Sequence, residues 1–296
     1  MQANVSGQAW REATPLVIGP PWRMCTPDPG RAAALAARCG MDPFIGQVLL
    51  NRGVDDPASA ERFLQPRLDA LEDPLQLPDM PRAVERIRRA IRSGEAVLVF
   101  GDSDVDGITG AAMLYELLRA HGARVTARVS NRVADGYGFP AGMIGRLVRA
   151  KITLLILVDC GTNQAAEILA LSQQGIDTIV LDHHVLGEHP AQPVAFVNPH
   201  RGASTSGMPC GVGLGFKLAQ AMEGEGPDRL AHWLDLVALG TLADYVPLVG
   251  DNRTVAILGL QRLPANPRLG LRRLWEQLRL RDARREPILH RLIPRL

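Results

Sequence analysis

Short apolar runs alternate with stretches of helical length between residues 96 and 197. The runs are Ala96–Phe100, Arg124–Val129, Thr153–Val158, Thr178–Leu181 and Val194–Val197. They are rich in β-branched residues, as expected of strands that are buried on both faces of a parallel sheet. The helices between and after them are expected near 107–121, 141–150, 164–175, 213–222 and 227–239. This alternation predicts an α/β fold with a doubly wound, mostly parallel sheet flanked by helices.

The segments outside this region have other patterns. Residues 1–30 are rich in Pro and Gly and are expected to be irregular. Asp56 and Pro57 have the types of an N-cap and a first helical residue, which predicts a helix over 57–64. Apolar positions spaced by three and four predict an amphipathic helix over 80–93. The predicted domains are an irregular and helical N-terminal segment (1–80), an α/β domain (81–265) and an Arg/Leu-rich connecting helix (266–296).

Composition narrows the class of protein. The 296 residues are 46% hydrophobic and 22% charged, which excludes disorder as the dominant state. No apolar run reaches the 18 residues of a membrane helix, and no secretory signal begins the sequence. Four scattered cysteines without a Cys-x-x-Cys pair favour a reduced, cytoplasmic protein. The net charge of +2 does not indicate a polyanion binder, but the Arg-rich segment 261–296 is strongly basic and the rest is acidic.

Acids and histidines follow three of the predicted strands. They are Asp102, Asp104 and Asp106 after the first strand, Asp159 after the third, and Asp182, His183 and His184 after the fourth. Because ligands bind beyond the carboxyl ends of the strands in open α/β sheets, we expect these side chains to meet at one edge. Asp244, which follows a predicted helix, is a further candidate.

Such a cluster needs a counter-charge, because carboxylates that lie close together repel each other. No Lys or Arg lies within the three loops, so two divalent metal ions are the natural counter-charge. Carboxylate oxygens with a minority of imidazole suit Mn²⁺ or Mg²⁺. Two such ions can clamp a phosphodiester and generate a hydroxide nucleophile. Asp159 is central in chain order and is the expected bridging ligand. A lone Asp-x-Asp is usually a solvated turn or an N-cap, but acids after three strands are harder to explain in that way.

These residues resemble a known superfamily. The motifs Asp102-x-Asp104-x-Asp106-Gly107, Val158-Asp159-x-Gly161 and Asp182-His183-His184 are similar to those of the DHH phosphoesterases. Within that superfamily the sequence most resembles the RecJ family of single-strand-specific 5′→3′ exonucleases. That likeness is carried by Asn131-Arg132, Asp135-Gly136-Tyr137-Gly138, Cys210-Gly211-Val212-Gly213 and Ala238-Leu239-Gly240-Thr241-x-Ala243-Asp244. It extends over nearly the whole chain from about residue 45.

The resemblance implies metal-dependent hydrolysis of phosphodiester bonds in single-stranded DNA, in DNA repair and recombination. The metal-ligand positions are matched by Asp104, Asp106, Asp159, His183 and Asp244, with Asp102 at the edge of the set. His184 is expected near the scissile phosphate, where it could stabilise charge or protonate the leaving oxygen, and Asp182 is expected to orient a histidine. Asn131 and Arg132 could hold the substrate phosphate, although Asn131 could also be a helix or turn cap.

The end of the sequence departs from the RecJ pattern. RecJ proteins continue into a further domain that binds the DNA strand, whereas this sequence stops near Leu296. Two alternatives therefore stay open: a truncated, non-catalytic module or subunit that needs a partner or second chain, and a phosphodiesterase of short oligonucleotides or dinucleotides. In the first, leucines of the tail would be exposed unless a partner covered them. These are Leu269, Leu271, Leu274, Leu278 and Leu280.

Overall fold

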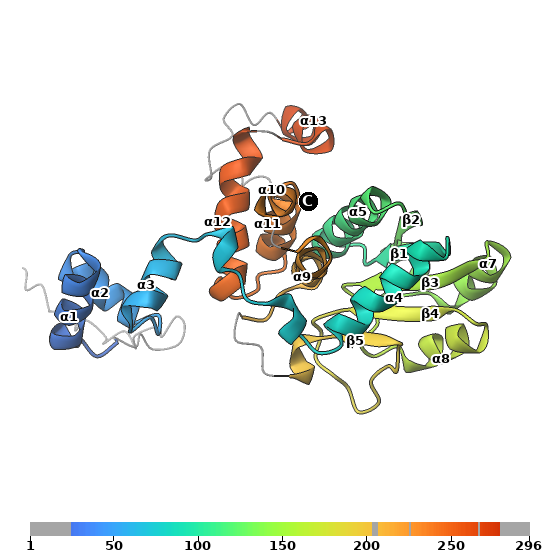
Figure 1. Cartoon of the computed structure of the whole chain (residues 1–296), viewed down its shortest axis with the longest axis horizontal. Coiled ribbons are helices and arrows are strands. Elements are labelled where there is room, and N and C mark those ends of the chain that lie inside the picture. Colours follow the sequence, from blue (N-terminus) through green and yellow to red (C-terminus); the bar gives the residue numbers. More distant parts are fainter. Residues whose placement is uncertain (1–24, 203–206, 225, 266, 279–296) are drawn as a thin grey trace, which may run out of the picture. The chain divides into compact units, whose positions relative to one another are not determined.

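The structure is a computed structural model that describes residues 25–202, 207–224, 226–265 and 267–278 (Figure 1). The chain divides into two compact units, residues 1–60 and 61–296. The domain bounds given above stay a prediction.

The first unit is helical wherever the structure describes it. Its helices are α1 (Pro29–Cys39), α2 (Pro43–Leu50) and the beginning of α3 (Pro57–Leu64). Each begins with Pro behind an Asp that accepts a backbone hydrogen bond, as Asp56 does from the N–H of Ser59 at 3.0 Å. Proline suits this position because it has no N–H, and an N–H in the first turn of a helix would have no partner within the helix. The predicted helix over 57–64 is confirmed.

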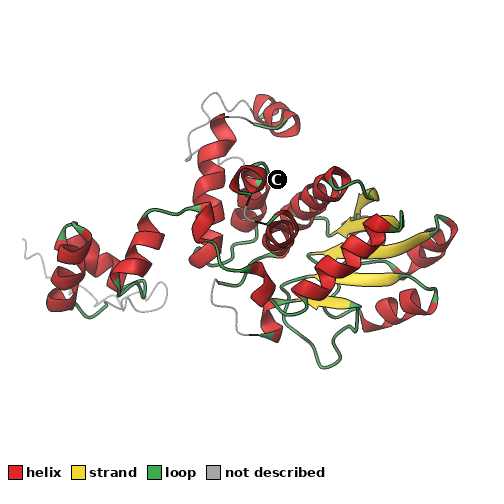
Figure 2. Ribbon diagram, in the orientation of Figure 1, coloured by secondary structure: helices red, strands yellow, loops and turns green. Residues whose placement is uncertain are grey.

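The second unit contains a five-stranded sheet, drawn in yellow in Figure 2. Its strands are β1 (Ala96–Gly101), β2 (Arg124–Val129), β3 (Ile152–Val158), β4 (Asp177–Leu181) and β5 (Ala195–Val197). They are all parallel, in the order β2-β1-β3-β4-β5. From β1 the chain passes to β2 on one side, and it then returns to β3 on the other side of β1. The topological switch point therefore lies between β1 and β3. Ligand sites of such folds lie at this point, beyond the carboxyl ends of the strands.

Helices cover both faces of the sheet, which confirms the doubly wound α/β prediction. One core joins the sheet to α4 (Met80–Arg92), α5 (Val105–Ala120) and α9 (Gly211–Glu223), and the other joins it to α7 (Ile144–Arg149) and α8 (Ala165–Gln173). The remaining helices are α6 (Arg132–Asp135), α10 (Pro227–Ala231), α11 (Leu234–Ala243), α12 (Gly250–Ala265) and α13 (Leu269–Gln277). In the described part of the chain, no helix has both the length and the apolar character needed to cross a bilayer.

Two details differ from the sequence prediction. The strand β2 is not buried on both faces, because it forms an edge of the sheet and most of its residues are exposed. The single helix expected near 227–239 is two helices, α10 and α11, because the chain turns at His232 and Trp233.

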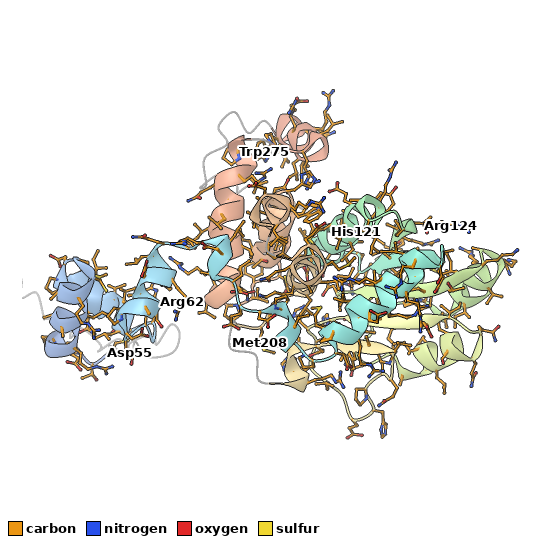
Figure 3. The ribbon with its side chains drawn as sticks, viewed as in Figure 1. Asp55, Arg62, His121, Arg124, Met208 and Trp275 are labelled. Atoms are coloured by element: carbon orange, nitrogen blue, oxygen red, sulfur yellow. The ribbon has the colours of Figure 1, made fainter. Side chains whose placement is uncertain are left out.

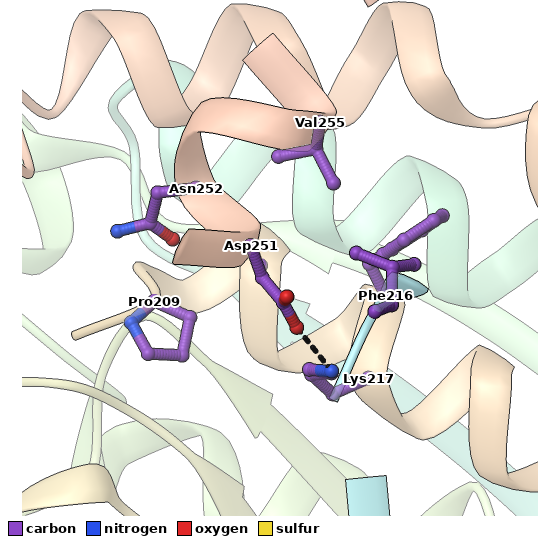
Figure 4. A pocket seen from close by; sticks show the side chains of 8 residues that line it. Pro209, Phe216, Lys217, Asp251, Asn252 and Val255 are labelled. Carbon is purple, nitrogen blue, oxygen red and sulfur yellow. Dashed lines mark ion pairs between the residues drawn. The ribbon is translucent and has the colours of Figure 1, made fainter. Parts of the chain in front are cut away.

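Ion pairs formed by a buried Arg and a buried Lys tie the elements together. On α4, the buried Arg86 bonds Glu95 at 2.7 Å and Asp177 at 2.6 Å, and we call these three residues the Arg86 cluster. Lys217 on α9 pairs with Asp251 at the start of α12, in the pocket shown in Figure 4. Such pairs are costly to break, because removing one partner leaves a buried charge without compensation.

The leucines of the tail are mostly covered by the chain itself. Trp275 of α13, labelled in Figure 3, is buried in a cluster with Leu260 and Leu263 of α12. Leu271, Leu274 and Leu278 pack against this cluster, whereas Leu269 is exposed. The expectation that these leucines would be exposed is therefore wrong for Leu271, Leu274 and Leu278, which are partly buried, and holds for Leu269. Leu280 lies outside the described residues.

Candidate metal centre and active site

The first carboxylate of the site follows β1 directly. Asp102 is buried, and it accepts hydrogen bonds from Ser130 Oγ at 2.8 Å and from Arg132 at 3.0 Å. A side chain at Gly107 would place its Cβ 2.4 Å from the backbone nitrogen of Asp102. Only glycine leaves room for this turn from β1 into α5.

Asp104 and Asp106 lie at the amino end of α5. Asp104 is the N-cap and accepts from the N–H of Gly107 at 3.0 Å. Asp106 is buried, and its two oxygens accept from the N–H groups of Gly211 at 2.5 Å and Val212 at 2.7 Å. These two donors begin α9, so one carboxylate joins the amino ends of two helices. Such ends favour negative charge because their N–H groups and dipoles point at it.

Asp159 follows β3 at the switch point, in a strained conformation. Its φ is +61°, which non-glycine residues rarely adopt, and only 2% of its surface is exposed. A Cβ on Gly211 would lie 2.6 Å from the Asp159 Cβ, so α9 approaches this residue as closely as a glycine permits. Strain of this kind persists where the surrounding structure imposes it, and it gathers at functional sites.

His183 lies at the centre of the cluster. Its Nε2 is 3.2 Å from Asp159 Oδ1, 3.6 Å from Asp244 Oδ2 and 3.9 Å from Asp106 Oδ2. The structure therefore brings together side chains from the ends of β3, β4 and α11 and from the start of α5. Among the described residues, His183 Nε2 and Asp244 Oδ2 are buried atoms without a hydrogen-bond partner. Such atoms are costly unless a further group satisfies them.

Three overlapping sets of side chains have ligand atoms that lie within 4.8 Å of one another. They are Asp102, Asp104 and Asp159; Asp106, His183 and Asp244; and Asp159, Asp182, His183 and His184. Carboxylate oxygen with some imidazole nitrogen is the donor set of Mn²⁺ and Mg²⁺. The two buried atoms without hydrogen-bond partners support the same conclusion. The residues present therefore fit divalent cations.

The acidity of the cluster agrees with this fit. Burial raises the pKa of Asp159 to about 12, with further repulsion from Asp106 and Asp104. Burial also raises the pKa of Asp106, to about 6, and that of Asp244. Without a cation, the cluster cannot hold all of its carboxylates ionised, because like charges in a buried site repel.

Asp182 and His184 form a pair beside the cluster. Asp182 Oδ1 lies 2.6 Å from His184 Nδ1, and its Oδ2 accepts from the N–H of Thr162 at 2.9 Å. Burial works to raise the pKa of Asp182, but these hydrogen bonds hold it below the usual range. The bond to Asp182 raises the pKa of His184. Asp182 thus orients His184 and favours its protonated form. The side chain of His184 is 42% exposed.

The two residues expected at the substrate phosphate lie after β2. Asn131 caps α6, because its Oδ1 accepts from the N–H groups of Val133 at 3.1 Å and Ala134 at 3.2 Å. These two hydrogen bonds are those of a helix cap, as the capping alternative expects. Arg132 is bonded to Asp102, and its side chain is 53% exposed. It supplies a cation to the cluster, whereas the loops after β1, β3 and β4 contain no Lys or Arg beside their acids.

Sequence reasoning left some neighbours of the site without a role. Tyr137 Oη lies 3.1 Å from His184 Nε2, and the Arg132 guanidinium stacks over the Tyr137 ring at 5.3 Å. Asn198 is fully buried and donates to the backbone oxygen of His184 at 2.9 Å. Only the family likeness pointed to Tyr137 in the sequence. The same likeness includes Asn198 with Pro199, and Asn198 directly follows β5.

Comparisons with known proteins agree with the fold and with the motifs. Residues 96–241 match the DHH family, N-terminal domain. The single-stranded-DNA-specific exonuclease RecJ of Bacillus subtilis (strain 168) is 35% identical over 280 residues, which are 93% of this chain and 35% of that protein. RecJ of Thermus thermophilus is 36% identical over 214 residues, or 71% of this chain and 32% of that one.

Solved structures give the same result. A crystal structure of exonuclease RecJ bound to manganese has a TM-score of 0.68 at 34% identity and covers 75% of this chain and 57% of its own. RecJ from Thermus thermophilus in complex with Mn²⁺ has a TM-score of 0.76 at 29% identity, with 92% of this chain and 39% of its own covered.

The chain belongs to the DHH family through its α/β domain. Over most of its length it is similar to the RecJ exonucleases, and it spans about a third of the length of the two curated relatives described above.

Proposed function

We propose that this protein is a metal-dependent phosphodiesterase that hydrolyses single-stranded DNA from its 5′ end, in the cytoplasm and in the service of DNA repair and recombination. The observation that carries the proposal is the buried cluster around His183 Nε2, with two polar atoms that lack partners. The names of the RecJ relatives supply the substrate and the metals.

In the proposed site, two Mn²⁺ or Mg²⁺ ions would be held by carboxylates and one imidazole. The ligands would be Asp102, Asp104, Asp106, Asp159, His183 and Asp244. Asp159 and His183 each belong to two of the three ligand sets, and of the two Asp159 would be the ligand shared between the ions, because a carboxylate has two oxygens to offer. When bound, such ions supply Lewis-acid stabilisation of the phosphoryl oxygens and activate the attacking water.

The remaining side chains would bind the strand and move a proton. Arg132 would contact the substrate phosphate, since its guanidinium is half exposed while Asp102 holds it in place. His184, kept protonated by Asp182, would donate its proton to the leaving oxygen. Asp182 would act through His184 rather than on the substrate. Asn131 would contribute by fixing the segment that presents Arg132.

The test is a nuclease assay of the purified chain with Mn²⁺, Mg²⁺ or EDTA. The substrates are a long single strand labelled at either end, the corresponding duplex and a dinucleotide. We expect mononucleotides to leave the 5′ end of the single strand when metal is present. Asp159→Ala should abolish this activity, whereas Asp228→Ala, at an exposed position of α10, should leave it unchanged.

Other outcomes would favour the alternatives. A chain that binds metal but never degrades single-stranded DNA would refute the proposal and favour a non-catalytic module or a subunit that needs a partner. Faster turnover of the dinucleotide than of the long strand would favour an oligonucleotide phosphodiesterase. The covering of Trp275 and its neighbouring leucines within the chain lessens the need for a partner at α13.

A further inference from the structure

Large exposed apolar side chains lie next in the chain to residues of the site. Three of the most exposed apolar residues that the structure describes each follow directly after a residue of the site. They are Val133 after Arg132, Val185 after His184 and Tyr245 after Asp244. The Cα atom of each is therefore about 3.8 Å from the Cα atom of a residue of the site. Exposed apolar side chains thus neighbour charged residues of the site in the chain.

Tyr245 is the least ordinary of the three. It is 83% exposed, and its φ of +59° lies in the left-handed region. Among the described residues only four non-glycine residues have a positive φ, and another of them is Asp159. Two of the four are thus at the site, and backbone strain persists where the surrounding structure imposes it.

The contacts of Tyr245 within the chain do not explain this conformation. Its hydroxyl has no hydrogen bond, and its ring has no aromatic or cation–π neighbour, among the residues that the structure describes. By contrast, Tyr115 of α5 bonds Arg119 at 3.2 Å, and Tyr137 contacts His184. The fold holds an aromatic ring in solvent, one residue from a proposed metal ligand, with no described contact that offsets the strain.

We propose that Tyr245 stacks on a nucleobase of the substrate, next to the phosphate that the metal-ligand cluster binds. The inference rests on the proposed function and assigns a specificity-determining residue within it. A nucleotide has a charged phosphate beside a flat apolar base, which matches a charged cluster with an exposed aromatic residue directly after one of its members. Stacking accepts every base, because each has a π-face, so Tyr245 would favour nucleic acid without selecting a sequence.

The experiment compares Tyr245→Ala, Tyr245→Phe and the control Tyr115→Ala on two substrates. Tyr115 is a suitable control because it lies about 15 Å along α5 from Val105. The substrates are a 5′-phosphorylated single strand and the same strand with abasic residues at its first three positions. The Mn²⁺-induced shift in melting temperature is measured for every variant, because it reports on Asp244 without any turnover.

We expect Tyr245→Ala to raise KM about tenfold on the base-bearing strand, within the roughly 5- to 150-fold range of lost base–aromatic stacking. Its kcat and its Mn²⁺-induced shift should match those of the wild type. Tyr245→Phe keeps the ring and should restore KM, and Tyr115→Ala should change nothing. On the abasic strand, the wild type and Tyr245→Ala should have the same KM.

The possible failures are distinguishable. If the wild type degrades the base-bearing strand and Tyr245→Ala does so with an unchanged KM, the stacking inference alone is wrong. The inference is also wrong if Tyr245→Ala loses the Mn²⁺-induced shift, because the residue would then only position Asp244. If the wild type degrades neither strand, the proposed function fails and the inference fails with it.

Discussion

Asp159→Asn should make the metal-free chain more stable than the wild type at pH 7, and Mn²⁺ should remove most of that difference by stabilising the wild type. In metal-free protein the pKa of Asp159 is raised to about 12, mainly by burial. At pH 7 the folded chain therefore holds a proton that the unfolded chain, with a carboxyl pKa near 3.8, has lost. Each pKa unit is worth about 1.4 kcal/mol, so taking up this proton costs about 4 kcal/mol at pH 7. Asparagine is neutral at every pH and removes that cost.

The sign of the pH dependence follows from the same imbalance. The folded state binds more protons than the unfolded state, so the free energy of unfolding of the metal-free wild type falls as the pH rises from about 4 to 7. The variant lacks this part of the slope. Mn²⁺ at a hundred times its Kd stabilises a competent site by about 2.7 kcal/mol, and only the wild type should gain it in full.

The measurement is urea unfolding at pH 5, 6 and 7, with EDTA or with Mn²⁺. Asp228→Asn, on the exposed surface of α10, should stay within about 0.5 kcal/mol of the wild type in both conditions. If Asp159→Asn is no more stable than the wild type in EDTA at pH 7, Asp159 does not carry the cost assigned to it. If both proteins gain equally from Mn²⁺, it is not a metal ligand.

Three further substitutions test the close approach of α9, the Asp182–His184 pair and the ion pairs of Arg86. Gly211→Ala should abolish the Mn²⁺-induced stabilisation and cost about 1–3 kcal/mol, because its Cβ would meet backbone and Cβ atoms of the site at 2.6–2.9 Å. Asp182→Asn should lower the pKa of His184 and move the alkaline limb of the kcat–pH profile to lower pH, since the bond between them raises that pKa. Arg86→Ala should destabilise the chain by about 3 kcal/mol at pH 7. Arg86 lowers the pKa of Glu95 against the effect of burial, so the difference in urea unfolding should shrink as the pH falls below about 4.

Matched controls exist for two of these. Gly142→Ala adds a Cβ with no described atom within 4 Å and should leave the response to Mn²⁺ intact. Arg89 also reaches Asp177, but its side chain is 57% exposed, so Arg89→Ala should cost less than about 1 kcal/mol. Equal effects of the Arg86 and Arg89 substitutions would contradict the role given to burial. A normal Mn²⁺-induced shift in Gly211→Ala, or an unmoved alkaline limb in Asp182→Asn, would refute those two predictions.

Much of this fold could be predicted, because its strands are apolar runs with clear ends. The helix over 57–64 was predictable from local chemistry, since Asp56 and Pro57 specify its start. The edge position of β2 was not, because the place of a strand within a sheet depends on topology, although Arg124, Thr126 and Arg128 already indicate an exposed strand. The covering of Leu271 and Leu274 likewise depends on how α13 packs against α12, which a pattern of leucines does not contain.

The candidate site was predictable to a similar degree. Parallel strands end at a common edge, and this rule alone gathers Asp102, Asp159 and Asp182. The partners of these residues were not predictable in the same way. The bond from Arg132 to Asp102 and the unusual backbone of Tyr245 arise from loop conformations, for which the sequence has no periodic signal.

The two hydrogen bonds of Asp106 carry a consequence for how the protein is made. They join residues that are 105 and 106 positions apart in the chain, so the carboxylate is held only after α9 has been synthesised and packed. Contacts of such long sequence separation form late, because a long loop must close first. A nascent chain that ends before α9 would present the acids of β1 and α5 without the backbone groups that fix them. The ability to bind a divalent cation tightly would then arise in one late step of folding.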